Sequence, residues 1–376
     1  MIYKKTLIFF EKNIIFIVLL IYLLYMLTIY FGSNYFFFIR EIKFGYILGS
    51  EEILNLKIPQ KKSYIGYILY IALFKYLNLN LTHVVYSQII LSSLSSLCLF
   101  KISEKLSSRF GGILCMMLYL FYFPLQVWNF YILTETIFIC SIIFIIFFLI
   151  FFKKKYLPII IFLTIFTITI KPHGIILIPS FFLSIFIWLY LNDNTKFLWF
   201  SLAMIIVLLY PFFLILNLYL ADTNIQTSIS RGWIIWGYED KNNNLNYKIS
   251  NYNNDNNLIS LLLFLKDNFF LVINSFFKKI WFFLIRVRPY YSEFHNFYLF
   301  IFNIVYYPLA FIGFIKLKSK KSFGVIFMCI LIVVFTFTIG LTYADWDSRF
   351  SLYILPYFFI FSAIGMVKII DFKKKH

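Results

Sequence analysis

The sequence predicts an all-α polytopic membrane protein with about ten transmembrane helices, and its composition and its apolar runs support this class. Hydrophobic residues make up 62% of the 376 residues and charged residues only 13%, against about 25% charged in an ordinary soluble domain. Apolar runs of about 18 residues or more recur from end to end, and each is long enough to cross a hydrocarbon core of about 30 Å. The runs are continuously apolar, which disfavours a transmembrane barrel with its alternating strands.

Lysine clusters at the ends of the apolar runs predict the orientation of the chain. The formal net charge is +18, and the short loops assigned to the cytoplasm are all basic, as the positive-inside rule expects. The first run is too long for a removable signal peptide and predicts a retained signal anchor. Heavy use of Ile, Phe, Lys, Asn and Tyr indicates a bacterial source. We therefore expect a bacterial inner-membrane, multi-pass protein with both termini cytoplasmic and no nucleic-acid partner.

The runs place the expected spans in order along the chain. They are residues 14–31, 84–100, 111–128, 136–152, 156–169, 174–191, 197–220, 297–315, 323–343 and 352–370. The spans 156–169 and 174–191 form a hairpin around Lys171-Pro172-His173, which either crosses the membrane twice or is re-entrant. Both ends of this hairpin are basic, so the orientation of the later spans is the same in either case.

Two polar intervals are predicted to lie outside. Residues 39–83 form the first outer loop with juxtamembrane helices. Its part 41–67 is either a solvated loop or a short amphipathic segment that lies on the membrane and presents a carboxylate to a site. Residues 221–296 form a large outer loop, rich in asparagine, with a folded flank at SISRGWIIWGY. Within it, 258–285 predicts an interfacial helix whose lysines reach toward phosphate headgroups.

Ionisable residues concentrate on the side predicted to be extracytoplasmic. Glu135 is the most informative, because it lies in ILTETIFI with apolar residues on both sides. An ionisable residue at the mouth of a span predicts a functional site; the alternative is a carboxylate that Arg or Lys holds to fix helix packing. The four cysteines lie inside apolar runs, which predicts buried thiols rather than metal ligands. The sequence has no GxxxxGK, CxxC, HExxH or GxSxG motif, so ATP, zinc and serine chemistry of the soluble types have no support.

The order of several segments resembles a known family. An outer acidic segment precedes SYIGYILYIALF; SQIILSSLSSLCLFKI and a basic turn follow, then FPLQVWNFYILTETIF, a Lys-Pro hairpin, and SRFSLYILPYFFIFSAIGM near the end. This order is similar to that of the bacterial polyprenyl-phosphate-dependent glycosyltransferases of the GT-C fold, related to protein mannosyltransferases and aminoarabinose transferases. The resemblance covers most of the chain and implies one integral membrane glycosyltransferase-like domain over residues 1–376. It also implies sugar transfer from a polyprenyl-phosphate donor to a lipid, glycan or protein acceptor at the extracytoplasmic face.

The resemblance also implies roles for particular residues. The family places an aspartate base a few residues before a tyrosine in the first outer loop. Here Tyr46 fits the tyrosine, position 42 is Ile, and Glu41 is the nearest carboxylate, so Glu41 is the expected base. Glu135 is expected to position the site or the acceptor. The substrate-binding candidates, led by the cations expected to bind the donor phosphate, are Arg349, Lys171, Arg286, Arg288, Glu51, Glu52 and His295. No resident cofactor is expected, and a divalent metal requirement is left open.

Two other functions remain as alternatives. A flippase or transporter for lipid-linked sugars predicts polar residues near the bilayer midplane and two similar halves, and the span interiors are nearly uncharged. An O-antigen-type polymerase is expected to depend on arginines in its large outer loop, and Arg231 is the only arginine between residues 221 and 257. Both features favour glycosyl transfer over these alternatives.

Overall fold

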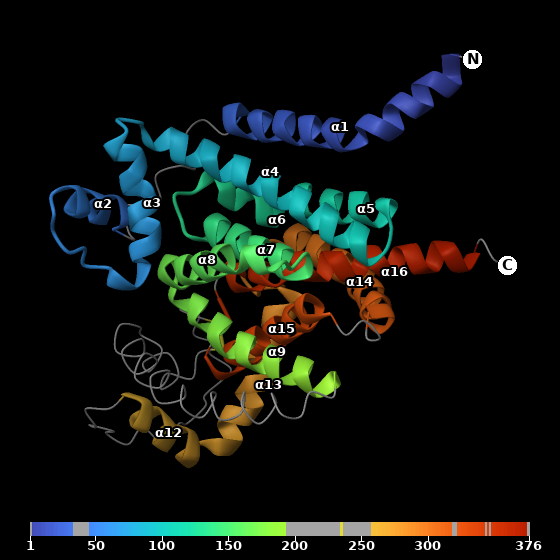
Figure 1. Ribbon diagram of the computed structural model, residues 1–376. Helices are drawn as coiled ribbons and strands as arrows, with labels where there is room; N and C mark the ends of the chain where they lie inside the picture. Colours follow the sequence, from blue (N-terminus) through green and yellow to red (C-terminus); the bar gives the residue numbers. More distant parts are fainter. Residues whose placement is uncertain are drawn as a thin grey trace. The chain divides into compact units, whose positions relative to one another are not determined.

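The protein is an assembly of helices. Its computed structural model describes residues 2–32, 45–192, 234–235, 257–317, 322–342, 344–345 and 347–373. Its α-helices are α1 Ile2–Gly32, α2 Tyr46–Leu54, α3 Ile65–Tyr76, α4 Leu81–Leu106, α5 Arg109–Leu120, α6 Phe123–Gln126, α7 Glu135–Ile150, α8 Leu157–Ile170, α9 Leu177–Leu191, α12 Asn257–Asp267, α13 Phe269–Ile285, α14 Glu293–Leu317, α15 Phe323–Leu341 and α16 Leu355–Lys373 (Figure 1). Its 3-10 helices are η2 Lys62–Tyr64, η3 Val127–Phe130, η4 Lys154–Tyr156, η5 Pro172–Ile176 and η6 Arg349–Tyr353. The predicted all-α class is confirmed over the described residues.

Several helices are long and apolar enough to cross a membrane. Among the described residues there are six: Asn13–Gly32, Leu81–Leu106, Pro172–Leu191, Glu293–Leu317, Phe323–Leu341 and Leu355–Phe372. The bent pair Arg109–Leu120 with Phe123–Phe130 makes seven if it is one span, and Glu135–Ile150 is a shorter apolar helix. A multi-pass membrane protein is therefore confirmed. The count of about ten is not reached, because α8 has only 14 residues and the expected span 197–220 lies outside the described residues.

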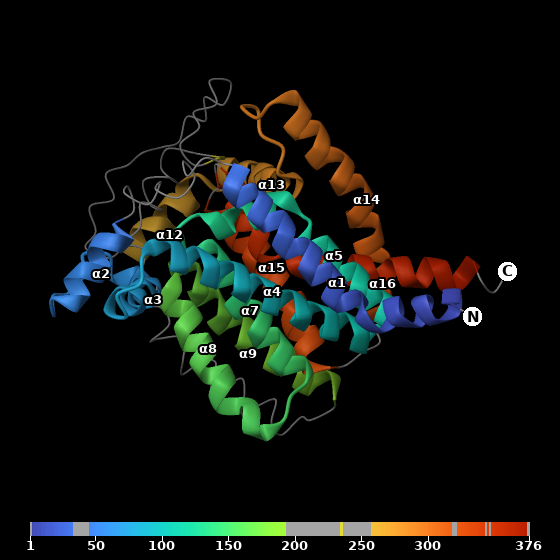
Figure 2. The ribbon, with the colours of Figure 1, turned by 90° about the horizontal axis from the view of Figure 1, so that it is seen from above.

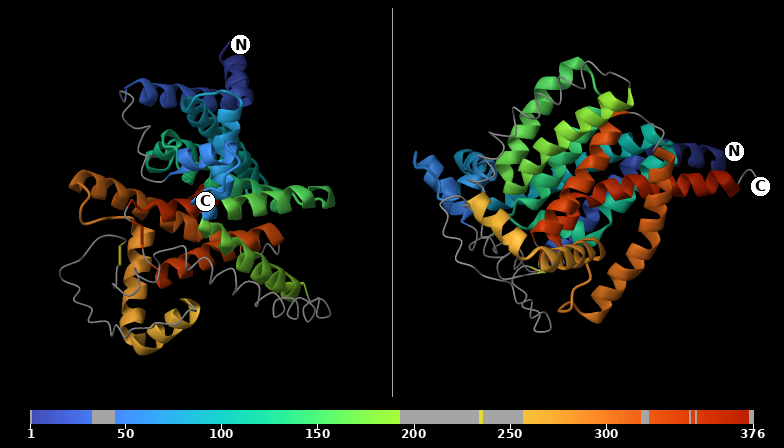
Figure 3. Two further views of the ribbon diagram at one scale, coloured as in Figure 1. Left: turned by 90° about the vertical axis from the view of Figure 1, so that its left-hand side faces the viewer. Right: turned by 90° about the horizontal axis from the view of Figure 1, so that it is seen from below.

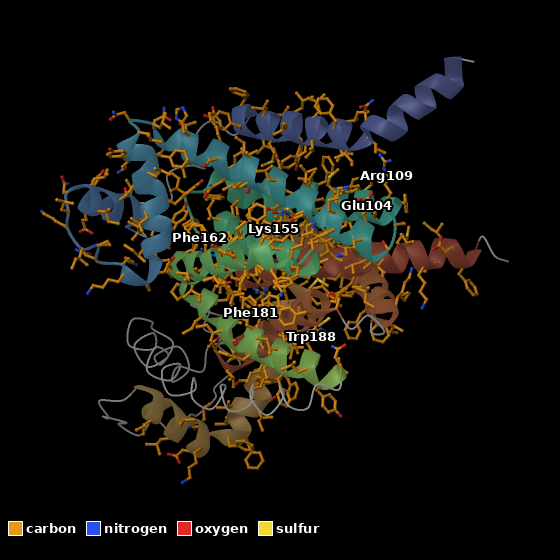
Figure 4. All side chains as sticks on the ribbon, in the orientation of Figure 1. Glu104, Arg109, Lys155, Phe162, Phe181 and Trp188 are labelled. Carbon is orange, nitrogen blue, oxygen red and sulfur yellow. The ribbon has the colours of Figure 1, made fainter. Side chains whose placement is uncertain are left out.

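The chain divides into two compact units. The first comprises Met1–Gly174, Pro308–Leu317 and Pro356–His376, and the second comprises Ile175–Tyr307 and Lys318–Leu355. In the first unit α4 packs along α5 and α7, and α7 packs along α8 (Figures 1 and 2). The start of α1 and the end of α16 lie on the same side of this unit as the turn from α4 to α5, which Glu104 and Arg109 mark (Figures 1, 2 and 4). The expectation that both termini are cytoplasmic stays a prediction.

A bend of 60° separates α5 from the segment Phe123–Phe130. Pro124 occupies the first turn of α6, a position that tolerates proline because its missing N–H has no helical partner there. Just beyond it, the Gln126 side chain accepts hydrogen bonds from the Tyr22 hydroxyl at 2.6 Å and from the Ser92 hydroxyl at 3.1 Å. Asn129 donates to the same Gln126 oxygen at 2.7 Å. We call these buried groups, together with Thr136, which donates to Asn129 Oδ1 at 2.9 Å, the amide network; it joins α1, α4, the bent segment and α7.

Helices α14 and α16 approach each other through glycine, within the first unit (Figure 2). A Cβ added at Gly313 would lie 1.9 Å from the Phe361 carbonyl oxygen, and one at Gly365 would lie 2.0 Å from the Leu309 carbonyl oxygen. Any side chain at these positions would collide with backbone. The two helices therefore touch through their backbones, as small residues allow between membrane helices.

Within the predicted first outer loop, residues 46–76 fold as a helical hairpin of α2, η2 and α3. Tyr46 is buried and contacts Tyr64 and Tyr67, with ring centroids 5.2 and 5.3 Å away. Within 41–67 the chain is helical at residues 46–54, and the alternative that this segment lies on the membrane stays a prediction. The part that precedes Gly45, with Glu41, lies outside the described residues.

In the second unit α15 packs against α9 and α13 (Figure 3). The expected single helix 258–285 is two helices, because the chain leaves helical geometry at the buried Asn268, whose φ is −118°. Of the predicted folded flank, residues 228–238, the structure describes Ile234 and Ile235. There Ala344 donates its N–H to the Ile234 carbonyl at 2.9 Å, and the three residues form an apolar cluster with Phe282 and Tyr290 against it.

Candidate functional site

A buried ion pair joins α7 to α8 in the first unit. The Lys171 ammonium lies 2.8 Å from Glu135 Oε1, and the two side chains are only 7% and 2% exposed. Glu135 is the first residue of α7, and Lys171 directly follows the last residue of α8. A carboxylate at a helix N-terminus and an ammonium at a helix C-terminus both interact favourably with the helix dipoles. One alternative for Glu135 was a carboxylate held by Arg or Lys to fix helix packing, and in the structure Lys171 is that basic partner.

The surroundings hold this pair in a fixed position. Thr136, next to Glu135, belongs to the amide network. After Lys171 the chain turns at once, with the Gly174 N–H donating to the Lys171 carbonyl at 2.8 Å. Gly174 lies so close to the preceding helix that a Cβ there would be 2.5 Å from the Thr167 carbonyl oxygen. Lys171 therefore binds the Glu135 carboxylate. The sequence analysis expected Lys171 to bind the donor phosphate and did not predict this ion pair.

The second unit contains a group of three arginines and one aspartate, which we call the arginine cluster: Arg286, Arg288, Asp345 and Arg349. Arg286 ends α13 in the left-handed region, at φ 63°. Its buried guanidinium donates to Asn303 Oδ1 at 2.8 Å and to the Tyr306 hydroxyl at 3.4 Å on α14. Arg286 therefore ties the end of α13 to α14.

Arg288 joins the same region to the turn before η6. It donates to the Asp345 carbonyl from Nη2 at 2.9 Å and from Nε at 3.3 Å, and to the Phe282 carbonyl from Nη1 at 2.6 Å. Burial lowers the pKa of the Arg288 guanidinium from its usual value. Because its donors point to backbone carbonyls, Arg288 acts mainly as a brace in this structure.

Arg349 is the least enclosed arginine of the cluster. Its Nε lies 3.0 Å from Asp345 Oδ2, and its side chain is 16% exposed against 4% for Asp345. The same carboxylate oxygen accepts the Arg349 backbone N–H at 3.2 Å. Asp345 therefore orients the Arg349 guanidinium, and the braced turn fixes Asp345.

Two tyrosines and a histidine border the cluster. Burial raises the pKa of both the Tyr290 and the Tyr291 phenols, so both stay protonated at neutral pH. The His295 ring stacks on Tyr291 with a centroid distance of 4.3 Å and an interplanar angle of 7°. His295 was expected to bind substrate, and the structure places it beside Tyr291.

The remaining predicted carboxylates belong to the α2–α3 hairpin. Glu51 pairs with Lys75 at 2.7 Å, and Glu52 Oε2 accepts the Gln60 N–H at 3.2 Å. Both contacts stabilise the hairpin locally. A substrate contact from Glu51 or Glu52 stays a prediction.

Lys279 is buried, although the sequence predicted that it would reach toward headgroups. It lies on α13, which is not one of the candidate spans, and is 2% exposed. The expectation that the lysines of 258–285 reach toward headgroups is therefore wrong for Lys279, although Lys266 is exposed. Lys279 shares a buried i, i+4 stripe with Ser275 and Phe283, and this helical phase is the signal that could have found it.

Replacing Lys279 by methionine is expected to stabilise the protein at neutral pH. Burial lowers the pKa of Lys279 to about 8 from a usual 10.5, which corresponds to an unfavourable ~3 kcal/mol for the charged form. Below pH 8 both states bind the proton and this destabilisation is fully present. It disappears as pH rises from about 8 to 10.5, because the folded state loses its proton first.

Thermal unfolding in detergent between pH 7 and pH 10.5 measures this effect. Wild type should gain stability across that range, and Lys279→Met should be more stable at pH 7 and lose that pH dependence. Lys278→Met is the matched control, because Lys278 is the adjacent residue and is only partly buried. Equal behaviour of the two variants would contradict the prediction.

No three His, Cys, Asp or Glu side chains gather in the described part of the chain in a way that could hold a metal ion. No protein-family model, curated protein or solved structure matches the chain. The helices define a multi-pass membrane protein. Its distinctive polar features are the buried Glu135–Lys171 pair with the amide network in one unit and the arginine cluster in the other.

Proposed function

We propose that this protein transfers a sugar from a polyprenyl-phosphate donor to a lipid, glycan or protein acceptor at the extracytoplasmic face of a bacterial inner membrane. The observation that supports this most is Arg349, a partly exposed guanidinium oriented by Asp345 in a turn that Arg288 braces. Guanidinium suits phosphate oxygens, because its planar donors match their geometry. As part of this proposal, the chain has a GT-C-like fold with about ten transmembrane helices.

The proposed reaction displaces the phosphate at the anomeric carbon. A carboxylate base takes the proton of the acceptor hydroxyl as its oxygen attacks that carbon, and Glu41 is the expected base. The bond from the anomeric carbon to the phosphate oxygen breaks, and polyprenyl phosphate leaves with an added negative charge. Arg349 stabilises this charge, while Glu135 and Lys171 support the geometry of the first unit.

The contacts of the other cationic residues support different roles for them within this proposal. Arg286 and Arg288 are buried and bonded to Asn303, Tyr306 and backbone carbonyls, so we now treat them as positioning residues. Lys171 is assigned to Glu135 rather than to the phosphate. Among the residues expected to bind the phosphate, Arg349 is thus the proposed ligand.

Arg349→Lys is expected to weaken the apparent donor affinity by roughly tenfold or more, because lysine keeps the charge but loses the planar fork. The measurement is release of polyprenyl phosphate by the purified protein during titration with polyprenyl-phosphate sugars. Arg109→Lys is the matched control, since Arg109 lies at the α4–α5 turn (Figure 4) and should leave the affinity unchanged.

The outcomes separate the residue assignment from the function. An unchanged donor affinity for Arg349→Lys would remove Arg349 from the phosphate site. If wild type moved the lipid-linked sugar across a vesicle membrane without releasing polyprenyl phosphate, it would be a flippase. Absence of release with every donor sugar tested, together with absence of transport, would refute the proposal as a whole.

A further inference from the structure

The loop that joins α2 to α3, together with α2, carries aliphatic side chains that are exposed on the surface of the protein. Leu56 is 96% exposed and Ile58 is 77% exposed, and Leu48 and Leu54 on α2 are also exposed. Leaving such a side chain in water forgoes about 1.5–3 kcal/mol relative to burying it. Single exposed leucines are ordinary, whereas several on one short segment indicate an interaction surface.

This loop is held in shape by its own hydrogen bonds. Leu56 donates its N–H to the Ile53 carbonyl at 2.9 Å, and Lys57 donates to the Glu52 carbonyl at 2.7 Å. The Glu52 carboxylate accepts the Gln60 N–H at 3.2 Å, and Pro59 is buried. The exposure of Leu56 and Ile58 therefore belongs to a defined conformation.

Leu56 is also disfavoured by its backbone. Its φ is 58°, in the left-handed region that costs an L-residue other than glycine roughly 1–2 kcal/mol. Asparagine or glycine would suit this position better in both backbone and solvation. Both the left-handed backbone and the exposure to water disfavour a leucine at this position. We therefore infer that a partner outside the chain stabilises it.

The chemistry around the loop identifies that partner as a lipid surface. Three lysines, Lys57, Lys61 and Lys62, surround the aliphatic side chains and are exposed, and they complement the phosphates of lipid headgroups. The hairpin is also tied to a candidate span, because only residues 77–80 separate α3 from α4. Segments that enter the boundary between headgroups and acyl chains typically carry exposed aliphatic groups flanked by cations.

We propose that the α2–α3 loop is a lipid-inserting wedge, in which Leu56 and Ile58 enter the acyl region and the three lysines bind headgroup phosphates. The wedge anchors the hairpin of residues 46–76 to the membrane surface at a second point besides α4. This inference is independent of the proposed glycosyl transfer.

Depth-dependent fluorescence quenching tests the wedge in the whole protein. The variants Leu56→Cys and Gln60→Cys are labelled with an environment-sensitive dye and reconstituted in vesicles of phosphatidylethanolamine and phosphatidylglycerol. The native cysteines lie buried or half-buried in helices, and labelled wild type gives the background. Spin labels on the acyl chains should quench the dye at position 56 at least twofold more than at the polar position 60, and aqueous iodide should show the reverse order.

A second variant keeps the proposal falsifiable. Leu56→Asn removes the exposed aliphatic group while suiting the left-handed backbone, so the fold should be kept or stabilised. In the Ile58→Cys background it should shift the dye emission to the red and abolish most of the acyl quenching. Equal iodide access at positions 56 and 60 would overturn the wedge. So would protection from iodide at position 56 without acyl quenching, which would indicate a protein partner.

Discussion

Replacing Glu135 by alanine is expected to destabilise the protein by about 3–5 kcal/mol, because the substitution leaves the buried Lys171 ammonium without its carboxylate. The pair is separated by 2.8 Å and is almost wholly enclosed. Unfolding of the purified protein in mixed micelles, with increasing SDS, measures the loss. The matched control is Glu51→Ala, since Glu51 lies 2.7 Å from Lys75 but is 55% exposed; it should change stability by only about 0–1 kcal/mol.

A double substitution separates structure from function at this pair. Glu135→Leu combined with Lys171→Met removes both charges and keeps volume, and buried pairs replaced in this way often lose little stability. We expect the double variant to fold and to lose sugar transfer if Glu135 serves the site. A stable double variant with full turnover would assign the pair to helix packing alone. If the Glu135→Ala loss matched that of the exposed control, the structural prediction would fail.

The second large effect is expected at the contact of α14 with α16. Gly→Ala inside a helix normally stabilises by about 1 kcal/mol. At Gly313 the new methyl would overlap the Phe361 carbonyl, at 1.9 Å, so the two backbones must separate. Overpacking of this kind costs typically about 1–3 kcal/mol and occasionally more. We therefore expect Gly313→Ala to destabilise the protein rather than stabilise it.

Gly32 provides the control for this prediction. A Cβ at Gly32 meets nothing within 4 Å, so Gly32→Ala should leave stability unchanged or slightly raised. Gly365→Ala should resemble Gly313→Ala, because its methyl would lie 2.0 Å from the Leu309 carbonyl. Thermal unfolding of the three variants in one detergent decides, and a stabilised Gly313→Ala would show that the helices are not in backbone contact.

The class of fold was predictable because membrane spans are encoded locally. Length and apolarity are sufficient to find a helix such as α4 or α15, and lysines mark the end of each that is predicted to be cytoplasmic. Breaks within apolar segments were harder to find. The chain bends at Phe121–Tyr122 before Pro124, and leaves helical geometry at Asn268. The position of such a break depends on which polar groups form hydrogen bonds with partners distant in sequence. Hydropathy contains no information about these contacts.

The candidate site was predictable as a list of residues but not as a set of contacts. Glu135 was conspicuous because its neighbours are apolar, yet its pairing with Lys171, 36 positions away, depends on how α8 folds back. Arg288 and Arg349 have the same side chain and lie near each other. Only the tertiary structure shows that one donates to backbone carbonyls while the other pairs with Asp345. The expected base, Glu41, stays a prediction.

The amide network implies an order for building the protein in the membrane. Gln126 and Asn129 carry polar groups that are expensive to place in hydrocarbon without partners. Synthesis proceeds from the N-terminus, so Tyr22 on α1 and Ser92 on α4 are already present when the bent segment leaves the ribosome. Only Thr136 comes later. The early helices thus supply hydrogen-bond partners for the bent segment, and we expect its insertion to depend on theirs.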